Sequence, residues 1–296
     1  MRMDRTSETD FEAHRAALLA LAYRMLGDLA RAEDMVQEAW LRWQARRAAV
    51  ESPRAYLITI VTRLCLDELG SPRARKEESR ADRLPEPVDL NESGLDRLEL
   101  LDQVSMAFLV VLQRLTPAER AVFLLHEVFE MRHDEIAPLV GKSDAACRQL
   151  LSRARGHVAA ERRVLQGRPE DHRRLLRAFV GAISGGDPAP LVELLAEDVV
   201  LIGDGGQGER RYGKIRKVGR PVVGKTRVAA LIRAIGAQPA PDVVVEERVL
   251  NGQPAIVLFQ AGEAVLAILV AVADGRLRQL FLHADPERLR RLQPLH

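Results

Sequence analysis

Helical periodicity dominates the first half of the chain. Apolar residues recur at three- and four-residue steps over residues 11–69 and again over about 95–165, which predicts two groups of packed amphipathic helices. Within the second group, Thr116 is placed as an N-cap, Pro117 lies at the first helical position and Glu119 can close a capping box. The stretch "GSPRARKEESRADRLPEPVDLNESG" between the groups has prolines, serines and mixed charge, and it predicts a linker.

After residue 167 the pattern changes to one or two helices, expected at 171–184 and 188–198, followed by short β-like runs. The runs are "VVLIG", "DVVVEERVL", "QPAIVLFQ", "EAVLAILVAV" and "LRQLFLH", and a further helix, "KTRVAALIRAIG", interrupts them. The connections "NGQP", "AGE" and "ADG" are typical of hairpin turns. This order predicts an α+β fold in which helices cover one face of a curved antiparallel sheet.

Residues 135–158, "EIAPLVGKSDAACRQLLSRARGHV", predict two short helices joined by a tight turn, each with one apolar stripe. Gly141 suits the positive-φ position that ends a helix, and Ser143 or Asp144 can cap the next helix. The small side chains at 145–146 are expected where the second helix crosses close to the first, as a helix-turn-helix requires. Pro138 is expected to distort the first helix or delay its start.

The second of these helices carries a polar, basic face beside its apolar stripe. Such side chains contact phosphates and read base edges in a major groove, although the same pattern on an isolated helix describes an ordinary solvated face. The turn, the small-residue crossing and the basic face together favour DNA. The residues expected to contact it are Lys142, Ser143, Arg148, Gln149, Ser152, Arg153 and Arg155.

Composition limits the classes of protein to which these elements can belong. A length of 296 residues favours at least two domains. The formal charge is only +2, so DNA binding must come from local patches. Cys65 and Cys147 both fall on apolar helix stripes, where buried thiols are expected and a disulfide or metal site is not. A leader peptide and a membrane span are not expected either, and a reducing cytoplasm fits.

The first half of the chain resembles the sigma-70 family of bacterial initiation factors. "LALAYRMLGDLARAEDMVQEAWLRW" with "SPRAYLITIVTRLCLDEL" resembles their region 2, and "LTPAERAVFLLHEVFEMRHDEIAPLVGKSDAACRQLLSRAR" resembles region 4. The spacing is similar to that of the compact extracytoplasmic-function (ECF) group. The resemblance implies an all-α region 2 at 8–72, a linker at 73–96 and a region 4 helix-turn-helix at 97–164.

The strand-rich tail, 170–296, resembles the cone-shaped SnoaL-like, or nuclear-transport-factor-like, fold, which one ECF subgroup carries. That subgroup shows "WLPEP", "DGGGK" and "NPDKL" motifs, which here read "RLPEP", "DGGQG" and "DPERL". Arg83 and Gln207–Gly208 depart from these motifs, and "ERRYGKIRK" resembles a basic insertion. The implied regulatory contacts between the motifs involve Leu84, Pro85, Glu86, Pro87, Asp204, Gly205, Gly206, Asp285, Pro286 and Leu289.

In region 2, polar and acidic residues recur at helical steps and form a ridge beside an apolar edge. By itself the ridge is an ordinary solvated face. The resemblance implies that it docks the β′ clamp helices of core RNA polymerase, with the β flap as a further contact in the complex. The ridge consists of Glu33, Asp34, Gln37, Glu38 and Leu41.

The segment that follows supplies cations and pockets suited to a strand whose bases have left the stack. Tyr56 is equally a candidate for packing. Arg63 and Gly70 replace an asparagine and an arginine found in many relatives, so promoter selectivity is expected to differ. The residues implied for the opened promoter strand are Arg54, Tyr56, Thr62, Arg63, Asp67 and Arg73.

The cone fold also occurs in enzymes, so catalysis is the rival class. The candidate acid–base residues are Asp198, Asp204, Tyr212 and His283, with His283 expected at the surface or hydrogen-bonded. The run "GDGGQGE" lacks the ending of a phosphate loop. We therefore expect a non-enzymatic sigma factor with no cofactor or metal, regulated in cis without a separate anti-sigma factor, and with an unidentified small ligand as an option. The alternative is a helix-turn-helix regulator with a ligand-sensing cone domain.

Overall fold

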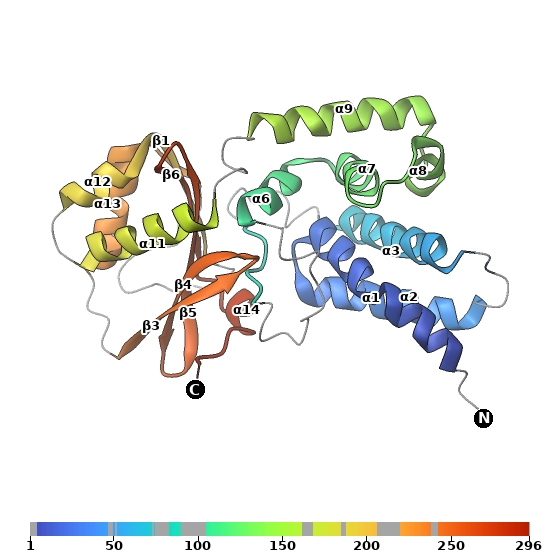
Figure 1. Ribbon diagram of the computed structural model, residues 1–296, viewed down its shortest axis with the longest axis horizontal. Helices are drawn as coiled ribbons and strands as arrows, with labels where there is room; N and C mark the ends of the chain where they lie inside the picture. Colours follow the sequence, from blue (N-terminus) through green and yellow to red (C-terminus); the bar gives the residue numbers. More distant parts are fainter. Residues whose placement is uncertain are drawn as a thin grey trace. The chain divides into compact units, whose positions relative to one another are not determined.

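The computed structural model (Figure 1) divides into two compact units. The first comprises Met1–Glu77, Arg97–Leu101 and Leu109–Ala160, and the second comprises Glu78–Asp96, Asp102–Phe108 and Glu161–His296. The described residues 83–89 of the predicted linker therefore belong to the second unit. The structure describes residues 5–46, 50, 52–72, 74, 83–89, 105–161, 168–184, 188–205, 220–237 and 242–295.

The first unit is helical in its described part. Helices α1, α2 and α3 pack on one another, α7 packs with α8 and α9, and α7 and α8 also contact α3. Buried apolar side chains such as Leu21, Leu57 and Leu124 form its interior. The helices are α1 (Arg5–Leu26), α2 (Leu29–Arg46), α3 (Pro53–Gly70), α6 (Met106–Arg114, of which 109–114 belong to this unit), α7 (Pro117–Glu127), α8 (His133–Val140) and α9 (Asp144–Ala160).

Side-chain caps set several of these helix boundaries. The predicted capping box of α7 is confirmed, because the Thr116 hydroxyl accepts from the Glu119 amide while the Glu119 side chain accepts from the Thr116 amide. Gly141 ends α8 at a φ of 62°, in the left-handed region that glycine adopts without strain. Of the two candidate caps of α9, the Ser143 hydroxyl accepts from the Ala146 amide at 3.2 Å. A tight turn between α8 and α9 results.

The second unit combines helices with one mixed sheet. In the described residues six strands lie in the order β2-β1-β6-β5-β4-β3. All neighbours are antiparallel except β1 and β6, which run parallel. The sequence predicted an antiparallel sheet, so this one pair departs from the prediction. The elements are α11 (Pro169–Ser184), α12 (Pro188–Leu194), β1 (Leu195–Asp204), β2 (Val222–Val223), α13 (Lys225–Gly236), β3 (Val243–Leu250), β4 (Gln253–Gln260), β5 (Glu263–Ala273), β6 (Arg276–His283) and α14 (Pro286–Leu289).

The three predicted hairpin turns are confirmed. Each has two consecutive residues with positive φ, as at Asn251–Gly252 (51° and 66°) and Asp274–Gly275 (54° and 69°). Two left-handed residues define the turn type that matches the twist of antiparallel strands. One boundary was wrong: 195–198 were expected in a helix, but β1 begins at Leu195, where Leu195 pairs with Leu277 of β6. Pairing with a neighbouring strand here outweighs local helix propensity.

Both faces of the sheet are covered. Alternate side chains such as Leu201, Val270 and Leu280 join α11, α12 and α13 in one apolar core. The residues between them, such as Leu269 and Phe281, are also buried although they point to the opposite face. We call this second surface the outer face. Segment 83–89 and α14 make their contacts with it.

Candidate nucleic-acid interface and linker-docking site

Helix α9 presents the predicted basic face to solvent. Its apolar stripe, including Cys147, Leu150 and Ala154, is buried, which fixes the opposite face outward. All seven residues expected to contact DNA are exposed: Lys142, Ser143, Arg148, Gln149, Ser152, Arg153 and Arg155. The structure therefore brings this predicted set together on one accessible surface.

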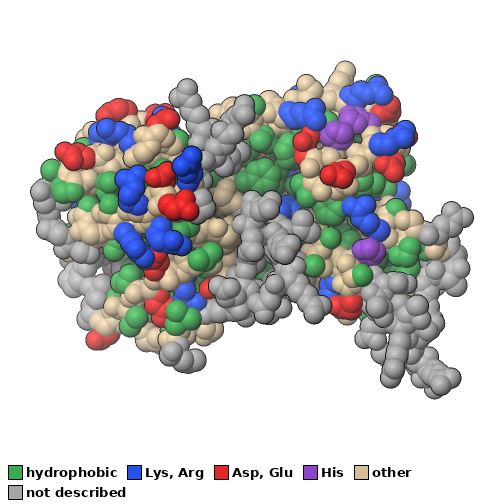
Figure 2. Space-filling model, viewed as in Figure 1, with side chains coloured by type: hydrophobic (Ala, Val, Ile, Leu, Met, Phe, Trp, Pro, Cys, Tyr) green, Lys and Arg blue, Asp and Glu red, His purple; other side chains and the backbone are tan. Residues whose placement is uncertain are grey.

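Each arginine of this face is paired with a carboxylate. Arg148 pairs with Asp144 one turn away, and Arg155 Nη2 lies 2.6 Å from Glu127 Oε1 on α7. Arg153 Nε lies 3.0 Å from Oε1 of Glu119, also on α7. Figure 2 shows that Lys and Arg side chains are interspersed with Asp and Glu side chains on the visible face. Each of these guanidinium groups therefore has a carboxylate neighbour within the protein.

Two expectations about the turn need correction. The residues at 145–146 were expected to be covered by the helix crossing, but Ala145 is exposed and Ala146 only half-buried. The close packing of α9 falls instead on Cys147 and its stripe. Pro138 does not delay α8, which begins at His133. Because Pro138 lies in the last turn, its missing amide removes a single helix hydrogen bond.

The acidic ridge of α2 is accessible. Asp34, Gln37 and Leu41 are exposed, whereas Glu33 and Glu38 are half-buried. Leu41 exposes 52% of its surface, which is high for a large apolar side chain. Glu38 Oε1 accepts from Arg42 Nε at 2.8 Å, one turn along the helix. An apolar side chain within an acidic surface suits a partner that carries both basic and apolar groups.

The predicted promoter-strand residues of α3 do not form one surface. Arg54, Arg63 and Asp67 are exposed. Tyr56 packs instead, with its ring centroid 6.0 Å from that of Trp43. Thr62 was expected to be accessible, but it is fully buried, because this turn of α3 faces the helices packed against it. Arg73 lies outside the described residues.

Two arginines bond across the helices of the first unit. Arg63 on α3 donates from Nη2 to the Pro138 carbonyl of α8 at 3.2 Å. That carbonyl lies in the last turn of α8, where no helical amide reaches it. Arg120 of α7 is buried and donates to the Met25 carbonyl of α1 as well as to the Leu112 carbonyl at 2.8 Å. Elements predicted for region 2 and region 4 are therefore bonded together.

In the second unit, segment 83–89 lies on the outer face of the sheet. The Leu84 amide donates to Asp204 Oδ2 at 3.1 Å, and the Leu84 side chain is 1% exposed. The same Asp204 oxygen lies 3.5 Å from Arg288 Nε of α14. The residues implied for contacts between "RLPEP", "DGGQG" and "DPERL" thus meet at Asp204. Gly205 is half-buried, and Gly206 lies outside the described residues.

Further along, the segment binds the β3–β4 hairpin. The Val88 amide donates to Asn251 Oδ1 at 3.1 Å, and the Asn251 amide donates to the Val88 carbonyl at 2.9 Å. Asp89 forms a buried ion pair with Arg248, with Oδ2 and Nη1 3.0 Å apart. Asp89 and Leu250 also form one isolated antiparallel β-bridge. The segment is thereby fixed in register, not merely in contact.

Segment 83–89 is also contacted by α14 and by the residues that follow it. Glu86 Oε1 lies 3.6 Å from Arg291 Nε, and Asp285 caps α14 by accepting from the Glu287 amide at 3.1 Å. Leu289 is buried. Sequence reasoning named Glu86, Asp285 and Leu289 but missed their arginine neighbours. The "DPERL" motif itself contains Arg288, so a pairing with the aspartate of "DGGQG" was the available signal.

The first residue of α6 is bonded to the same sheet. The Met106 amide donates to Gln253 Oε1 at 3.1 Å, and Gln253 Nε2 donates to the Val270 carbonyl at 3.1 Å. Sequence reasoning missed Gln253, Asn251 and Arg248 because the turn signal "NGQP" indicated only a hairpin. We call segment 83–89, its partners and this Met106 contact the linker-docking site.

His283, expected at the surface or hydrogen-bonded, is neither. It pairs in register with Asp204 and Ala267, is fully buried, and neither ring nitrogen has a partner among the described residues. Burial, with a smaller effect of the nearby Arg288 guanidinium, lowers the pKa of His283 to about 3. The imidazole is therefore neutral at any ordinary pH. On the outer face His283 lies near the Asp204 carboxylate and the Arg288 guanidinium, but its ring nitrogens form no hydrogen bond with either.

The C-terminal unit should consequently lose stability in mild acid. The unfolded state binds a proton at His283 below its ordinary pKa of about 6.5, whereas the folded state does not until about 3. The free energy of unfolding should thus fall by about 1.4 kcal/mol per pH unit below 6.5. Calorimetry of the C-terminal transition at pH 7.5 and 5.5 measures this effect. Equal pH dependence in wild type and His283→Phe would contradict it.

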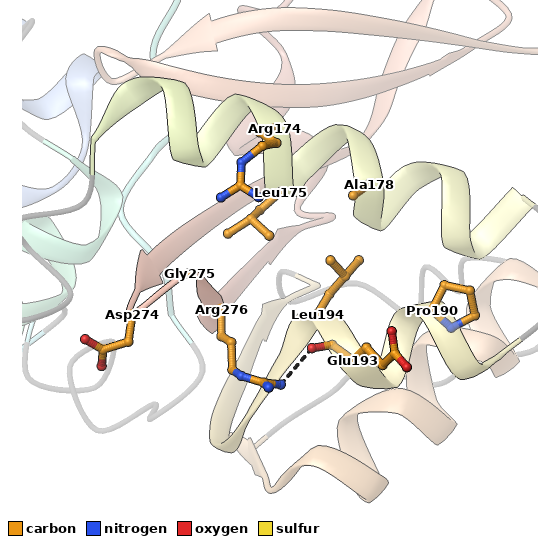
Figure 3. A pocket seen from close by; sticks show the side chains of 9 residues that line it. All are labelled: Arg174, Leu175, Ala178, Pro190, Glu193, Leu194, Asp274, Gly275 and Arg276. Carbon is orange, nitrogen blue, oxygen red and sulfur yellow. Dashed lines mark hydrogen bonds between the residues drawn. The ribbon is translucent and has the colours of Figure 1, made fainter.

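One hollow in the second unit does not resemble a catalytic site. A hollow of about 520 Å³ lies between α11, α12 and the β5–β6 turn, and Figure 3 shows that Arg276 reaches across it to the Glu193 carbonyl. Arg174 and Asp274, which also line it, are paired with Asp171 and Arg278. None of Asp198, Asp204 and His283 lines the hollow, and Tyr212 lies outside the described residues.

Among the described residues no helix is long and apolar enough to cross a membrane. The same part of the chain contains no cluster of three or more His, Cys, Asp or Glu side chains arranged to hold a metal ion. Both cysteines are buried and unpaired. The described residues do form a basic face on α9, an acidic ridge on α2 and a segment, 83–89, docked on the sheet.

Comparisons with known proteins identify the family to which the chain belongs. The family models of Sigma-70 region 2 and Sigma-70 region 4 match residues 11–75 and 105–158. The chain is 35% identical over 283 residues to "Probable ECF RNA polymerase sigma factor SigI" of Mycobacterium tuberculosis (strain CDC 1551 / Oshkosh), covering 94% of this chain and 93% of that protein. It is 34% identical over 307 residues to "ECF RNA polymerase sigma factor SigJ" of strain ATCC 25618 / H37Rv, covering 97% and 96%.

A solved structure extends the similarity to the whole architecture. The crystal structure of the Mycobacterium tuberculosis extracytoplasmic function sigma factor SigJ matches with a TM-score of 0.71 and 32% identity, over 96% of this chain and 98% of that one. Helical regions 2 and 4 followed by an α+β cone are thus confirmed as the fold class. Because relatives above 30% identity match along almost the full length, the chain belongs to the ECF group of sigma-70-family RNA polymerase sigma factors.

Proposed function

We propose that this sigma factor binds core RNA polymerase through α2, engages the opened promoter strand through α3 and reads the −35 element through α9. The observation that carries the proposal is the helix-turn-helix α8–α9, whose seven predicted DNA-contacting residues are all exposed. Such a protein performs no chemistry of its own and works with polymerase in the cytoplasm.

Run-off transcription with core polymerase and genomic DNA tests this function and identifies a cognate promoter. A sigma factor should co-purify with core polymerase, bind promoter DNA weakly alone and direct transcripts with defined starts. The alternative, a helix-turn-helix regulator with a ligand-sensing cone, predicts tight DNA binding without polymerase. The hollow in Figure 3 gives that alternative little support, because Arg174, Asp274 and Arg276 in its lining already bond to other protein groups.

The ridge of α2 leads to a test of polymerase docking. Reversing Asp34 and Glu38 to lysine should weaken association with core polymerase about ten-fold at low salt, because the ridge would repel a basic partner helix. The residual binding should also respond less to added salt. Titration of labelled protein with core polymerase at two salt concentrations measures both effects.

A matched control uses two other exposed acids. Glu197 and Asp198 of β1 are exposed, so reversing them to lysine makes the same change in net charge away from the ridge. Polymerase affinity should then stay at the wild-type value. Equal affinity of wild type and the Asp34/Glu38 variant would show that the ridge is only a solvated face.

We further propose that the first unit represents a resting arrangement. A sigma factor at a promoter holds regions 2 and 4 on two separated DNA elements, whereas here Arg63 bonds to α8 and Arg120 bonds to α1. Arg63 is also predicted to contact the promoter strand. Moving regions 2 and 4 apart onto the two elements would break the bond from Arg63 to Pro138, so promoter engagement and the packed arrangement compete.

The C-terminal unit is proposed to regulate this arrangement in cis. Leu84 and Met106 are bonded to β1 and β4, which lie three strand spacings apart, or about 14 Å across the sheet. The same 22 residues could span about 70 Å if released and extended. Docking therefore limits how far regions 2 and 4 can separate. We propose that this restraint replaces a separate anti-sigma factor.

A further inference from the structure

Glu119 of α7 makes two kinds of contact at once. Its Oε2 accepts from the Thr116 hydroxyl at 2.8 Å and from the Thr116 amide at 3.1 Å. Its Oε1 lies 3.0 Å from Arg153 Nε. The two oxygens are thus divided between capping α7 and holding a side chain of the recognition helix.

The setting makes Glu119 a rigid anchor. Its side chain is 8% exposed while that of Arg153 is 63% exposed. The partners of the other two arginines are more exposed by the same measure: Asp144 is 41% and Glu127 is 34% exposed. A buried carboxylate fixed by a capping box restricts an arginine more than an exposed one does.

The geometry also selects which edge of Arg153 is presented. Arg155 uses both Nε and Nη2 on Glu127, whereas the contact of Arg153 runs through Nε. The Nη1–Nη2 edge can therefore point outward as a two-pronged donor. Such a fork matches the O6 and N7 acceptors of guanine.

We propose that Glu119 is a positioning residue that orients Arg153 to read one guanine of the −35 element. This rests on the proposed function of α9. A phosphate contact fits less well, because the Glu119 carboxylate offsets the charge that would attract a phosphate. A base contact gains from orientation, since the rotamer freedom of a long side chain is already lost before binding.

Glu119→Gln separates this role from helix capping. A glutamine at this position still closes a capping box, with its carbonyl toward Thr116. Its amide group then faces Arg153 Nε, and two donors cannot bond. Circular dichroism and thermal unfolding should match wild type within error, whereas Thr116→Ala should weaken the cap and leave Arg153 anchored.

The readout is a panel of cognate promoters substituted one base pair at a time in the −35 element, transcribed by the full-length protein with core polymerase. We expect Glu119→Gln to reduce discrimination about five-fold at a single position, the same position at which Arg153→Ala loses its preference. In the Arg153→Ala background, Glu119→Gln should have no additional effect.

Three results would overturn the proposal: unchanged discrimination, a loss spread evenly over all positions, or an equal loss in the Arg153→Ala background. Stronger binding to every sequence would show that Arg153 contacts a phosphate which Glu119 had been weakening. Failure of the underlying function is distinguishable. In that case Arg148→Ala and Arg155→Ala would also leave the entire panel unchanged.

Discussion

Replacing Arg148, Arg153 and Arg155 with alanine should abolish start-specific transcription while leaving association with core polymerase intact. The three side chains lie on the exposed face of α9, whereas polymerase docking is assigned to α2. Each contact with a base is worth about 1–3 kcal/mol when bidentate, so losing three should reduce promoter output by more than about a hundred-fold. Run-off transcription and a polymerase-binding titration measure the two activities separately.

The matched control removes three exposed arginines from another helix. Arg173, Arg174 and Arg177 of α11 are exposed, and their replacement by alanine changes the net charge equally. Their loss should leave promoter output near wild type. Undiminished output from the α9 variant would remove region 4 from DNA recognition and favour the solvated-face interpretation of that helix.

Local chemistry predicted the elements whose boundaries depend on it. Thr116 and Glu119 identify the start of α7 because a capping box needs only neighbours in sequence. The end of α8 at Gly141 and the "NG" and "DG" turns were predicted correctly for the same reason, since a positive φ is a property of individual residues. The basic face of α9 was also predictable, because helical periodicity determines which side chains share a side.

Errors arose where tertiary contacts decide the outcome. Residues 195–198 have a helical pattern, yet pairing with β6 makes them a strand. Thr62 lies on a polar-looking position of α3, yet helices distant in sequence bury it. His283 ends a strand, where exposure is common, but α14 and the linker-docking site cover the outer face there. Periodicity identifies a face and not what covers it.

The linker-docking site was predicted only in part. The resemblance named Leu84 and Asp204, and the structure places the Leu84 amide 3.1 Å from the Asp204 carboxylate. It gave no indication of Asn251 or Arg248, which fix the far end of the segment. Segment 83–89 lies on the outer face, forms one β-bridge from Asp89 to Leu250 and belongs to the same compact unit as the cone. We therefore regard linker and cone as one regulatory element.

Replacing Leu84 with aspartate should release the segment. The leucine is 1% exposed, and burial of such a side chain contributes about 1.5–3 kcal/mol. An aspartate there would also bring a second carboxylate close to Asp204. The docked population should thus fall about a hundred-fold. Limited trypsin cleavage after Arg83 should accelerate accordingly, while calorimetry should still show a cooperative C-terminal transition, at a lower temperature than in wild type because the docked segment stabilises the folded cone.

Release of segment 83–89 from the cone should also change which promoters the sigma factor transcribes. With Leu84 free, regions 2 and 4 can separate further. Transcription from a cognate promoter should then change several-fold. The variant should also tolerate promoters whose spacer is one or two base pairs longer better than wild type does. Asp204→Ala should act in the same direction but less strongly, because the apolar contacts of Leu84 remain. Val244→Asp, at a valine 56% exposed on β3, provides the control, since it introduces the same charge without touching the segment. If trypsin cleavage accelerates in Leu84→Asp while output and spacer tolerance stay at wild-type values, docking does not restrain the two DNA-binding regions, and the cone must serve a role other than regulation in cis.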